Sequence, residues 1–363
     1  MPKLEITGVS KDYGNIHALN DVSLHVEDKE YVCVIGPSGC GKSTLIRCIS
    51  GIEQPSSGEI YVDGKSVKKT LIEDRKIGYV FQDIALFPHL TVRDNLAYGL
   101  AVRQTPTNEM RTVTNEMLGL INMRDRARSL PNELSGGAQQ KVAVGRAIAT
   151  GAHLFLLDEP LGALDAIVRA ELRYELRKLA SDLGLTVIHV THDQEEALSI
   201  ADRVVIMKNG RIIEVGRPAE IYHHPKALFT ANFVGETNLI EGTVSKVDGA
   251  LCTIDILNHH VSLQCHRKHV GQRIVISIRP ESVLLSPQTE EGWEGRVKQV
   301  AFLGSLNRYV IDVGGIDVVS EISTAEYNTN FGVGETVSLF LEEANMTLFD
   351  YPEEGLEREI ALE

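Results

Sequence analysis

The segment GPSGCGKST, at residues 36–44, restricts the possible folds of this chain more than any other stretch. It matches the pattern G-x-x-x-x-G-K-[ST] in full. The apolar run YVCVIG leads into it, and the helix-like run KSTLIRCIS follows. A strand, a glycine-rich turn and a helix N-terminus together form a cradle of backbone N–H groups for phosphate. The sequence therefore predicts a phosphate loop at the end of a buried parallel strand.

Each part of this loop has an expected role. The backbone N–H groups of residues 39–44 would hold a β-phosphate, Lys42 would bridge the β- and γ-phosphates, and Ser43 would ligate Mg²⁺. The predicted nucleotide-binding residues of the loop are Gly36, Pro37, Ser38, Gly39, Cys40, Gly41, Lys42, Ser43 and Thr44. Cys40 is interpreted as a tolerated variable position, but its thiol is expected to make ATP binding sensitive to alkylating reagents.

Two later apolar runs, HLFLLDEP and TVIHVTHD, each end in a group of polar residues at the carboxyl end. Ligands gather at those ends in open α/β sheets. We expect Asp158 beside Mg²⁺, directly or through water, and Glu159 positioned to polarise a water against the γ-phosphate. His192 could orient that water. Taken alone, the two acids could equally cap a surface turn, and His192 or Gln82 could be ordinary structural residues.

A second anion-binding pattern lies about a hundred residues later, in LSGGAQQKVAVGRA from Leu134. Ser135 is a good helix cap, two glycines follow it, and apolar residues then recur at helical spacing. Backbone N–H groups at such a helix start favour anions. One chain thus carries two predicted phosphate-binding turns.

Bulk composition excludes several classes of protein. The 363 residues suffice for two or three domains, and 43% hydrophobic with 24% charged residues is ordinary for a soluble globular protein. A net charge of −14 disfavours nucleic-acid binding. We expect neither a membrane-spanning segment nor a secretory signal. Five cysteines without a CxxC pair favour a reducing cytoplasm over a disulfide scaffold.

The chain divides into two parts by pattern. Short strand-like runs and the buried parallel strands fill the first part, with a helix-rich stretch at about residues 88–150. From about residue 236 onward, short alternating strands and glycine-rich turns indicate a small all-β domain of the oligomer-binding (OB) type. The predicted domains are therefore 1–235 and 236–363, and the acidic end YPEEGLEREIALE is expected to be a solvated tail or last helix.

The order of these motifs resembles the ATP-binding subunits of ABC transporters. Tyr13, GPSGCGKST, FQD, LSGGAQQ, LFLLDEP, ALD and THD carry the resemblance, which covers about residues 3–235. It implies an α/β P-loop NTPase fold, with a parallel core sheet, an antiparallel β subdomain and a helical subdomain. It also implies that the protein is an ATPase, with ATP and Mg²⁺ as its cofactors.

The resemblance assigns roles position by position. Tyr13 resembles the aromatic residue that stacks on adenine. Gln82 resembles the residue that links Mg²⁺ and the attacking water to the membrane partner, so Ser43, Gln82 and Asp158 form the expected metal set. Glu159 resembles the general base, and His192 resembles the switch histidine.

In this family two subunits pack head to tail, which explains the second anion-binding turn. Ser135, Gly136 and Gly137 of one copy would close over ATP in the other copy, and Asp165 would lie in the loop that communicates across the dimer. The chain departs from the family pattern at Ala138, where Gln or Glu is usual, at Lys141 and at Gly145. The first change is expected to remove one polar contact with nucleotide, and the glycine to cost about 1 kcal/mol of helix stability.

Residues 236–363 resemble the C-terminal (TOBE) regulatory domain of importer ATPases, notably in IRPESVLL and AFLGSLNRYVIDV. The resemblance predicts the ATP-hydrolysing subunit of an importer, peripheral at the cytoplasmic face of the membrane. Its partners would be a second copy, membrane permease subunits and, indirectly, a solute-binding protein, with no nucleic acid. The solute would be a polyamine, ferric iron or a similar small solute. An exporter ATPase and a soluble non-transport ATPase are the alternatives.

One cluster stands outside these motifs. The stretch HHVSLQCHRKH holds five possible metal ligands: His259, His260, Cys265, His266 and His269. A polar surface with incidental histidines is the favoured interpretation, and a regulatory metal sensor is the alternative.

Overall fold

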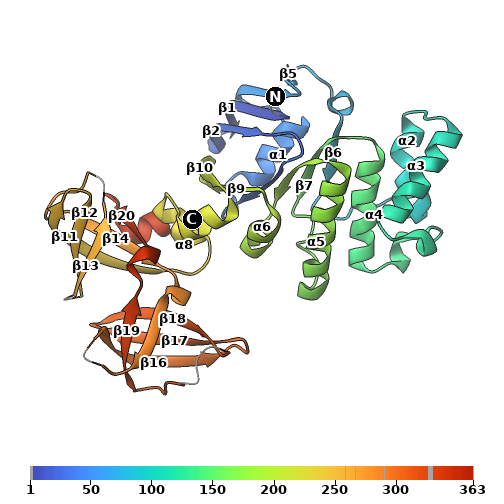
Figure 1. The fold of residues 1–363 in the computed structure, drawn as a ribbon. Helices are drawn as coiled ribbons and strands as arrows, with labels where there is room; N and C mark the ends of the chain where they lie inside the picture. The colour runs from blue at the N-terminus through green and yellow to red at the C-terminus, as the bar shows by residue number, and fades with distance from the viewer. Residues whose placement is uncertain (1–2, 258, 266, 290, 326–329, 363) are drawn as a thin grey trace. The chain divides into compact units, whose positions relative to one another are not determined.

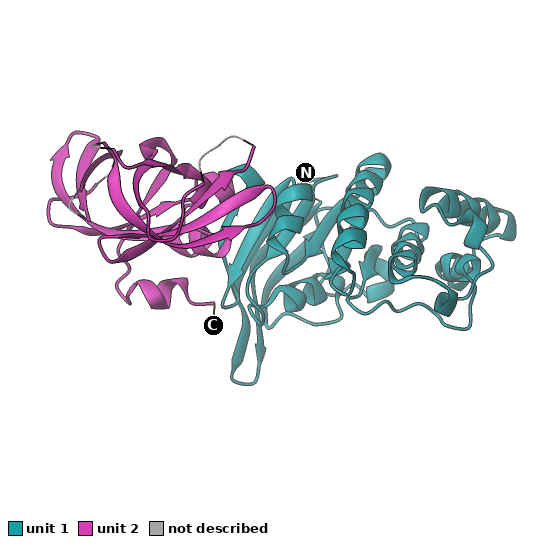
Figure 2. Cartoon of the chain, turned by 90° about the horizontal axis from the view of Figure 1, so that it is seen from below, with its two compact units in different colours: residues 1–219 teal, residues 220–363 magenta. Residues whose placement is uncertain are grey.

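The computed structural model describes residues 3–257, 259–265, 267–289, 291–325 and 330–362. The chain forms two compact units, Met1–Ala219 and Glu220–Glu363 (Figure 2). The short helix α8 (Leu228–Phe233) packs through Leu228 and Ala231 against Val275 and Phe349 of the second unit. This division lies before the domain boundary expected after residue 235, which stays a prediction. No helix among the described residues combines the length and apolar character needed to cross a membrane.

The first unit is built on a six-stranded central sheet with the order β10-β9-β3-β8-β7-β6 (Figure 1). Its strands are β3 (Tyr31–Ile35), β6 (Ile77–Val80), β7 (Leu154–Asp158), β8 (Thr186–Val190), β9 (Arg203–Lys208) and β10 (Arg211–Gly216). Neighbouring strands from β9 to β6 are parallel, and β10 returns antiparallel to β9. The three apolar runs expected as buried parallel strands are β3, β7 and β8, so this prediction is confirmed.

An antiparallel sheet of order β2-β1-β4-β5 lies over one side of the unit. It comprises β1 (Leu4–Tyr13), β2 (Ile16–Val26), β4 (Ser57–Val62) and β5 (Lys65–Ser66). Helix α1 (Lys42–Ser50) packs between the two sheets, because its Leu45, Ile46 and Ile49 join one core with Val34 of β3 and Val22 of β2. Glycine and asparagine turns permit both hairpins: Asp63-Gly64 and Asn209-Gly210 have positive φ throughout.

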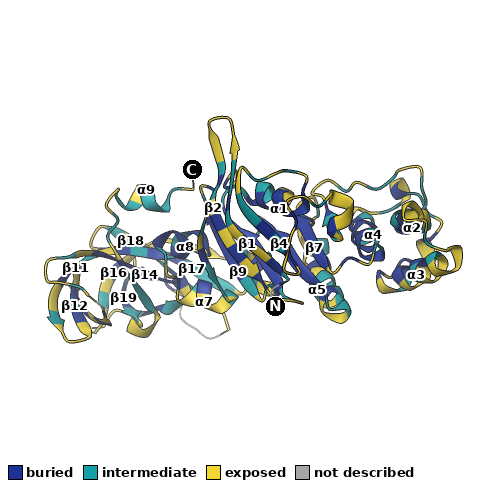
Figure 3. Ribbon diagram, turned by 90° about the horizontal axis from the view of Figure 1, so that it is seen from above, coloured by how far each residue is buried: buried dark blue, intermediate teal, exposed yellow. Residues whose placement is uncertain are grey.

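Strand alternation distributes the central sheet's side chains between its two faces. Leu154 and Leu156 face the core that contains α1, whereas Phe155 and Leu157 face helices α4 (Gly136–Ala149) and α5 (Ala166–Leu183). Both faces are covered, so β3, β7 and β8 are buried at every position (Figure 3). The remaining α-helices of this unit are α2 (Val92–Val102), α3 (Thr107–Leu120) and α6 (Gln194–Ile200); α7 (Pro218–His223) begins at its last two residues and continues into the second unit. Figure 1 shows α2, α3 and α4 beside one another near β6.

The second unit contains two five-stranded antiparallel sheets, of orders β13-β12-β11-β14-β20 and β15-β19-β16-β17-β18. The first uses β11 (Asn238–Asp248), β12 (Leu251–Ile256), β13 (His259–Gln264), β14 (Arg273–Ile278) and β20 (Met346–Asp350). The second uses β15 (Val283–Pro287), β16 (Trp293–Phe302), β17 (Leu306–Val313), β18 (Ile316–Ser323) and β19 (Thr336–Leu341). Inward side chains of both sheets form one core, and the acidic end forms α9 (Leu356–Ile360). The β-rich prediction for this region is confirmed.

One sequence-based expectation about the cysteines is wrong. Cys252 of β12 and Cys265, just after β13, form a disulfide in the core of the second unit, although composition favoured free thiols. Antiparallel pairing of β12 with β13 brings the two buried residues together, and cysteine spacing alone does not record that pairing. The remaining cysteines, Cys33, Cys40 and Cys48, are free and buried.

The possible metal ligands of HHVSLQCHRKH are also dispersed. Cys265 is occupied by the disulfide, His260 Nδ1 lies 2.6 Å from Asp255 Oδ1, and His259 stacks on Trp293. His266 lies outside the described residues. No group of three metal-ligating side chains occurs among the residues that the structure describes. The metal-sensor alternative therefore gains no support from the fold.

Candidate nucleotide-binding site

The phosphate loop connects β3 to α1, and close backbone approach requires glycine at positions 36 and 41. Gly41 has φ of 105°, and a Cβ there would lie 2.3 Å from the Ala18 carbonyl oxygen of β2. A Cβ on Gly36 would lie 2.3 Å from the Met207 carbonyl oxygen of β9. Gly210 N–H donates to the Cys40 carbonyl at 3.0 Å. The loop is therefore fixed between the antiparallel sheet and the β9–β10 turn.

Lys42 lies folded over this loop. Its Nζ donates to the carbonyl oxygens of Gly36 and Pro37, both at 2.8 Å, and the residue is buried. These bonds place the ammonium group at the loop itself, where it can compensate the charge of a bound phosphate.

The Cys40 thiol does not have the character expected of a reactive group. Cys40 is only 4% exposed, and burial raises the pKa of its thiol in spite of the neighbouring Lys42 ammonium. Thiolate and access are both needed for alkylation, so the structure opposes the expected sensitivity to alkylating reagents.

Ser43 and Asp158 come together from α1 and the end of β7. The Ser43 hydroxyl donates to Asp158 Oδ1 at 3.1 Å, and the Tyr79 hydroxyl of β6 donates to Asp158 Oδ2 at 3.0 Å. A hydroxyl and a carboxylate are the oxygen donors that Mg²⁺ prefers, so these two residues fit such an ion. Sequence reasoning missed Tyr79. The pairing of β6 with β7, which brings Tyr79 to Asp158, was not predicted from the sequence.

Glu159 joins the other two predicted catalytic residues. Gln82 Nε2 donates to Glu159 Oε2 at 3.0 Å, and His192 Nδ1 lies 3.4 Å from the same oxygen. Glu159 has φ of 47°, an uncommon value for a residue with a side chain. Its N–H donates to the Val190 carbonyl of β8, which holds this turn against the strand that ends before His192. The site thus contains a carboxylate between an amide and an imidazole that is largely exposed.

Tyr13 ends β1 at the edge of the same region. Its ring is 41% exposed, and Lys11 Nζ lies 4.8 Å from the ring centroid. The β1–β2 hairpin that carries Tyr13 also provides Ala18, whose carbonyl borders Gly41. An exposed ring on this hairpin can stack on a planar base.

The second anion-binding turn begins helix α4. Ser135 caps the helix by accepting from Ala138 N–H at 3.4 Å, and a Cβ on Gly137 would lie 2.8 Å from Val168 of α5. Asp165 caps α5 by accepting from Val168 N–H at 3.1 Å. Within the described part of the chain, no hydrogen bond or ion pair joins residues 135–137 to the phosphate loop. The fold therefore does not assemble these two anion-binding turns into one site.

Lys141 and Gly145, which depart from the family pattern, both make close contacts with neighbouring helices. Lys141 Nζ lies 2.6 Å from Glu175 of α5. A Cβ on Gly145 would lie 3.0 Å from Leu96 of α2 and 3.1 Å from Ile121. The glycine thus permits close packing of α4 on α2, which offsets part of its cost in helix propensity.

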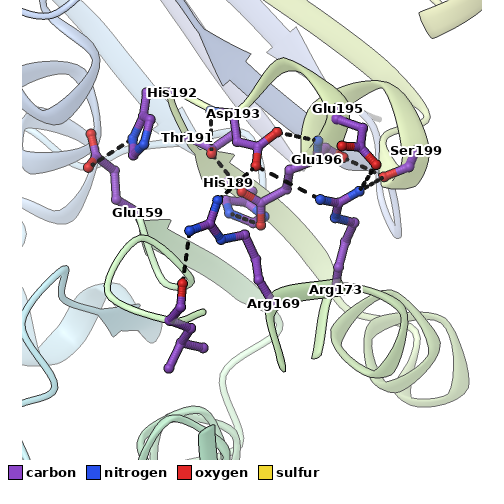
Figure 4. Close-up of polar contacts among 11 residues, drawn as sticks. Glu159, Arg169, Arg173, His189, Thr191, His192, Asp193, Glu195, Glu196 and Ser199 are labelled. Carbon is purple, nitrogen blue, oxygen red and sulfur yellow. Dashed lines mark hydrogen bonds and ion pairs between the residues drawn. The ribbon is translucent and has the colours of Figure 1, made fainter. Parts of the chain in front are cut away.

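A polar network behind His192 was not predicted from sequence (Figure 4). Arg169 of α5, Asp193 and Glu196 belong to it, and His189 lies fully buried beneath. Asp193 and Glu196 have the three-residue spacing at which two side chains can cap a helix start reciprocally. Only one of the two caps forms: Asp193 accepts from Glu196 N–H at 3.0 Å, while the Glu196 carboxylate accepts from Thr191 Oγ1 at 2.6 Å.

Comparison with known proteins agrees with this geometry. The ABC transporter family matches residues 19–162, and the TOBE domain family matches residues 276–349. The sulfate/thiosulfate import ATP-binding protein CysA of Synechocystis is 42% identical over 301 residues, 83% of this chain and 82% of that protein. The spermidine/putrescine import ATP-binding protein PotA of Thermotoga maritima is 39% identical over 318 residues, 85% and 86% of the two chains. The putrescine transport ATP-binding protein PotG of Escherichia coli is 38% identical over 326 residues, 88% and 86%.

Solved structures show the same relationship. A dimeric post-hydrolysis state of an ATP-binding cassette bound to ADP and Pi superposes with a TM-score of 0.53 and 32% identity, covering 59% of this chain and 98% of that one. A Clostridium perfringens protein that is part of an ABC transporter complex has a TM-score of 0.58 and 29% sequence identity. The match covers 64% of this chain and 94% of that one. Identity to import subunits over more than four fifths of the chain, both family matches and the clustered nucleotide motifs agree. This chain belongs to the ATP-binding subunits of ABC transporters, as an ATP-hydrolysing importer subunit with a C-terminal TOBE domain.

Proposed function

We propose that residues 36–44 bind the ATP phosphates and that Glu159 activates the water that attacks the γ-phosphate. The contacts of Glu159 with Gln82 and His192, next to the Ser43–Asp158 pair, carry this proposal. A carboxylate in this position can accept the proton of the water, and His192 can orient the γ-phosphate or the water. Lys42 would neutralise phosphate charge, and Tyr13 would stack on adenine.

Mg²⁺ would be held by Ser43 and Asp158, with Gln82 as a third oxygen donor. When bound, the ion neutralises charge on the β- and γ-phosphates. Asp158 is buried and already accepts from Tyr79 and Ser43, so its carboxylate is held in a single orientation. Tyr79 would thereby position the metal-binding carboxylate.

A complete site would require two copies packed head to tail. Ser135, Gly136 and Gly137 at the start of α4 would close over ATP bound to the phosphate loop of the second copy, with Asp165 near the same interface. The helix N-terminus offers N–H groups and positive potential to the γ-phosphate. The dimeric relative that holds ADP and Pi supports this arrangement. ATP would stabilise the closed dimer and hydrolysis would release it.

The proposed setting is the cytoplasmic face of a membrane, where the dimer would drive permease subunits. We propose residues 1–235, including the helical stretch 88–150, as the nucleotide-binding domain, and 236–363 as the regulatory domain. Relatives named for spermidine, putrescine and sulfate support import of a small ionic solute. Of these solutes, we propose a polyamine.

Two measurements test the proposal. Light scattering of the Glu159→Gln chain should show dimers that form only with ATP. The matched chain with Glu159→Gln and Ser135→Arg should stay monomeric, because the arginine side chain blocks the turn at residues 135–137 that would close over ATP. Purification of tagged chain from detergent-solubilised native membranes should recover permease subunits and a solute-binding protein by mass spectrometry. Calorimetry of that binding protein with spermidine, putrescine, sulfate and Fe³⁺ identifies the solute. If the Glu159→Gln chain stays monomeric with ATP, the head-to-tail dimer is contradicted. If the tagged chain purifies without membrane partners, the importer role is contradicted.

A further inference from the structure

Arg169, in the first turn of α5, joins two loops that lie far apart in the sequence. Its Nη2 donates to the Leu164 carbonyl at 2.8 Å, and its Nη1 donates to Asp193 Oδ2 at 3.3 Å (Figure 4). Leu164 precedes Asp165, the residue proposed to lie at the dimer interface. Asp193 follows His192 directly. One guanidinium group therefore spans the proposed interface loop and the histidine turn.

The histidine turn is also held by β3, where Thr191 N–H donates to the Val34 carbonyl at 3.2 Å, and by α6. Asp193 Oδ1 accepts from Glu196 N–H at 3.0 Å, and Asp193 N–H donates to Thr191 Oγ1 at 3.0 Å. Thr191 Oγ1 in turn donates to the buried Glu196 carboxylate at 2.6 Å. These bonds tie residues 191–193 to α6. His192 itself is 57% exposed and reaches Glu159 at 3.4 Å.

The charges around Asp193 stabilise its hydrogen bond with Arg169. Burial alone raises the pKa of Asp193, but the Glu196 amide, Arg169 and Arg173 together outweigh burial and lower it. The carboxylate is therefore ionised at neutral pH. Both side chains are partly buried, where a charge-assisted bond is stronger than at an exposed surface.

Neighbouring Arg173 does not make the same connection. Its guanidinium approaches Asp193 only to 3.9 Å, and it donates to Glu195 at 3.2 Å and Ser199 at 3.3 Å. Those contacts pack α5 on α6. Among the described residues, the hydrogen bond to the Leu164 carbonyl belongs to Arg169 alone.

We propose that Arg169 is a positioning residue that sets the place of His192 through Asp193 and couples it to the interface loop at Leu164. This inference rests on the proposed hydrolytic role of His192 and Glu159. A shift of the Leu164 carbonyl in the dimer would draw Arg169, and with it Asp193 and His192, relative to Glu159. The guanidinium group of Arg169 binds Asp193 and the Leu164 carbonyl, so its effect passes through the histidine turn.

The test is a double-mutant cycle on ATP hydrolysis by the full chain. Arg169→Gln should lower kcat about tenfold while KM for ATP stays within about twofold, because misplacement of a reacting group affects the chemical step. Arg169→Lys retains the charge and should recover part of the loss. In a His192→Ala background, Arg169→Gln should cause no further decrease, because residues that act through one group are not additive.

Arg177→Gln is the matched control. Arg177 lies on the same helix and pairs with Asp202 at 2.6 Å, away from the histidine turn. Its removal should leave kcat unchanged, with any loss of thermal stability similar to that of Arg169→Gln. If the losses from Arg169→Gln and His192→Ala multiply, or if Arg169→Gln has wild-type kcat, the inference is wrong. If Arg169→Gln fails to fold, a double-mutant cycle of Arg169→Lys and His192→Ala replaces it, and multiplication of their losses in kcat again shows that the inference is wrong.

Failure of the proposed function has a different signature. A wild-type chain without ATPase activity, or a His192→Ala variant as active as wild type, rejects the proposed chemistry before Arg169 is considered. If the wild-type chain hydrolyses ATP, His192→Ala lowers kcat and Arg169→Gln leaves kcat unchanged, only the positioning role of Arg169 is rejected.

Discussion

The side-chain amide of Gln82 donates to the same Glu159 oxygen, Oε2, that lies 3.4 Å from His192 Nδ1. Gln82 follows the edge strand β6, whereas His192 follows β8 two strands away in the sheet. One carboxylate oxygen thus receives contacts from both sides of the nucleotide site. Movement of either loop would therefore change the contacts of the Glu159 carboxylate.

Glu159→Gln should abolish most hydrolysis without abolishing ATP binding. The amide keeps the shape of the carboxylate but cannot accept the proton of the water, a role worth about 10²–10⁴-fold in rate. Single-turnover phosphate release and equilibrium ATP binding separate the two effects. Glu171→Gln, an exposed position on α5, is the matched control and should hydrolyse ATP as wild type does. Comparable turnover by both variants would remove Glu159 from the chemistry.

Gly41→Ala should weaken ADP binding by more than about tenfold. The new Cβ would meet the Ala18 carbonyl at 2.3 Å and would need φ of 105°, so the phosphate loop has to move. Gly14→Ala is the control, because φ is 61° there but nothing lies within 4 Å of the new Cβ. That change should cost only about 1 kcal/mol of stability and leave ADP affinity intact. Calorimetric titration measures both, and unchanged affinity in Gly41→Ala would contradict the loop geometry.

Reduction of Cys252–Cys265 should lower the unfolding free energy of the second unit by about 3 kcal/mol, as expected for a bridge across 13 positions. The single tryptophan, Trp293, lies in this unit, so urea unfolding followed by its fluorescence reports on this unit. A Cys252→Ala/Cys265→Ala variant should be insensitive to reductant. Mass spectrometry under non-reducing conditions verifies the bridge. Equal unfolding midpoints for wild type with and without reductant would show that the bridge contributes nothing.

Burial of His189 should make stability fall in mild acid. Burial lowers the pKa of His189 to about 3 from 6.5, so below pH 6.5 the unfolded chain binds a proton that the folded chain does not. The unfolding free energy should therefore decrease as pH falls, approaching about 1.4 kcal/mol per pH unit. Glu196, whose pKa is raised mainly by burial, contributes with the opposite sign at lower pH.

The measurement is urea unfolding by circular dichroism at pH 7.5, 6.5 and 5.5. His189→Gln should show a shallower dependence on pH than wild type. His153→Gln, an exposed control, should keep the wild-type slope. Identical slopes in His189→Gln and wild type would mean that His189 is not held neutral in the folded chain.

Local sequence determined the elements that carry the site. The strand, glycine turn and helix around residues 36–44, the strand ends at Asp158 and His192, and the capped start of α4 are visible in the sequence. Each depends on neighbours within about ten positions: hydrophobic period, positive-φ glycines and cap residues. For the same reason, the alternating strands after residue 236 predicted a β-rich second part.

Tertiary structure alone decided which distant residues meet. Tyr79 reaches Asp158 because β6 lies beside β7, and Cys252 meets Cys265 because β12 pairs with β13. Arg169 reaches Asp193 only after α5 has packed against α6. Such contacts depend on the packing of whole elements, and a local pattern of residue types does not record the partner that packing selects. Burial acts in the same way: it changed Cys40 from an expected reactive thiol to an inert one, because access and pKa are properties of the folded core.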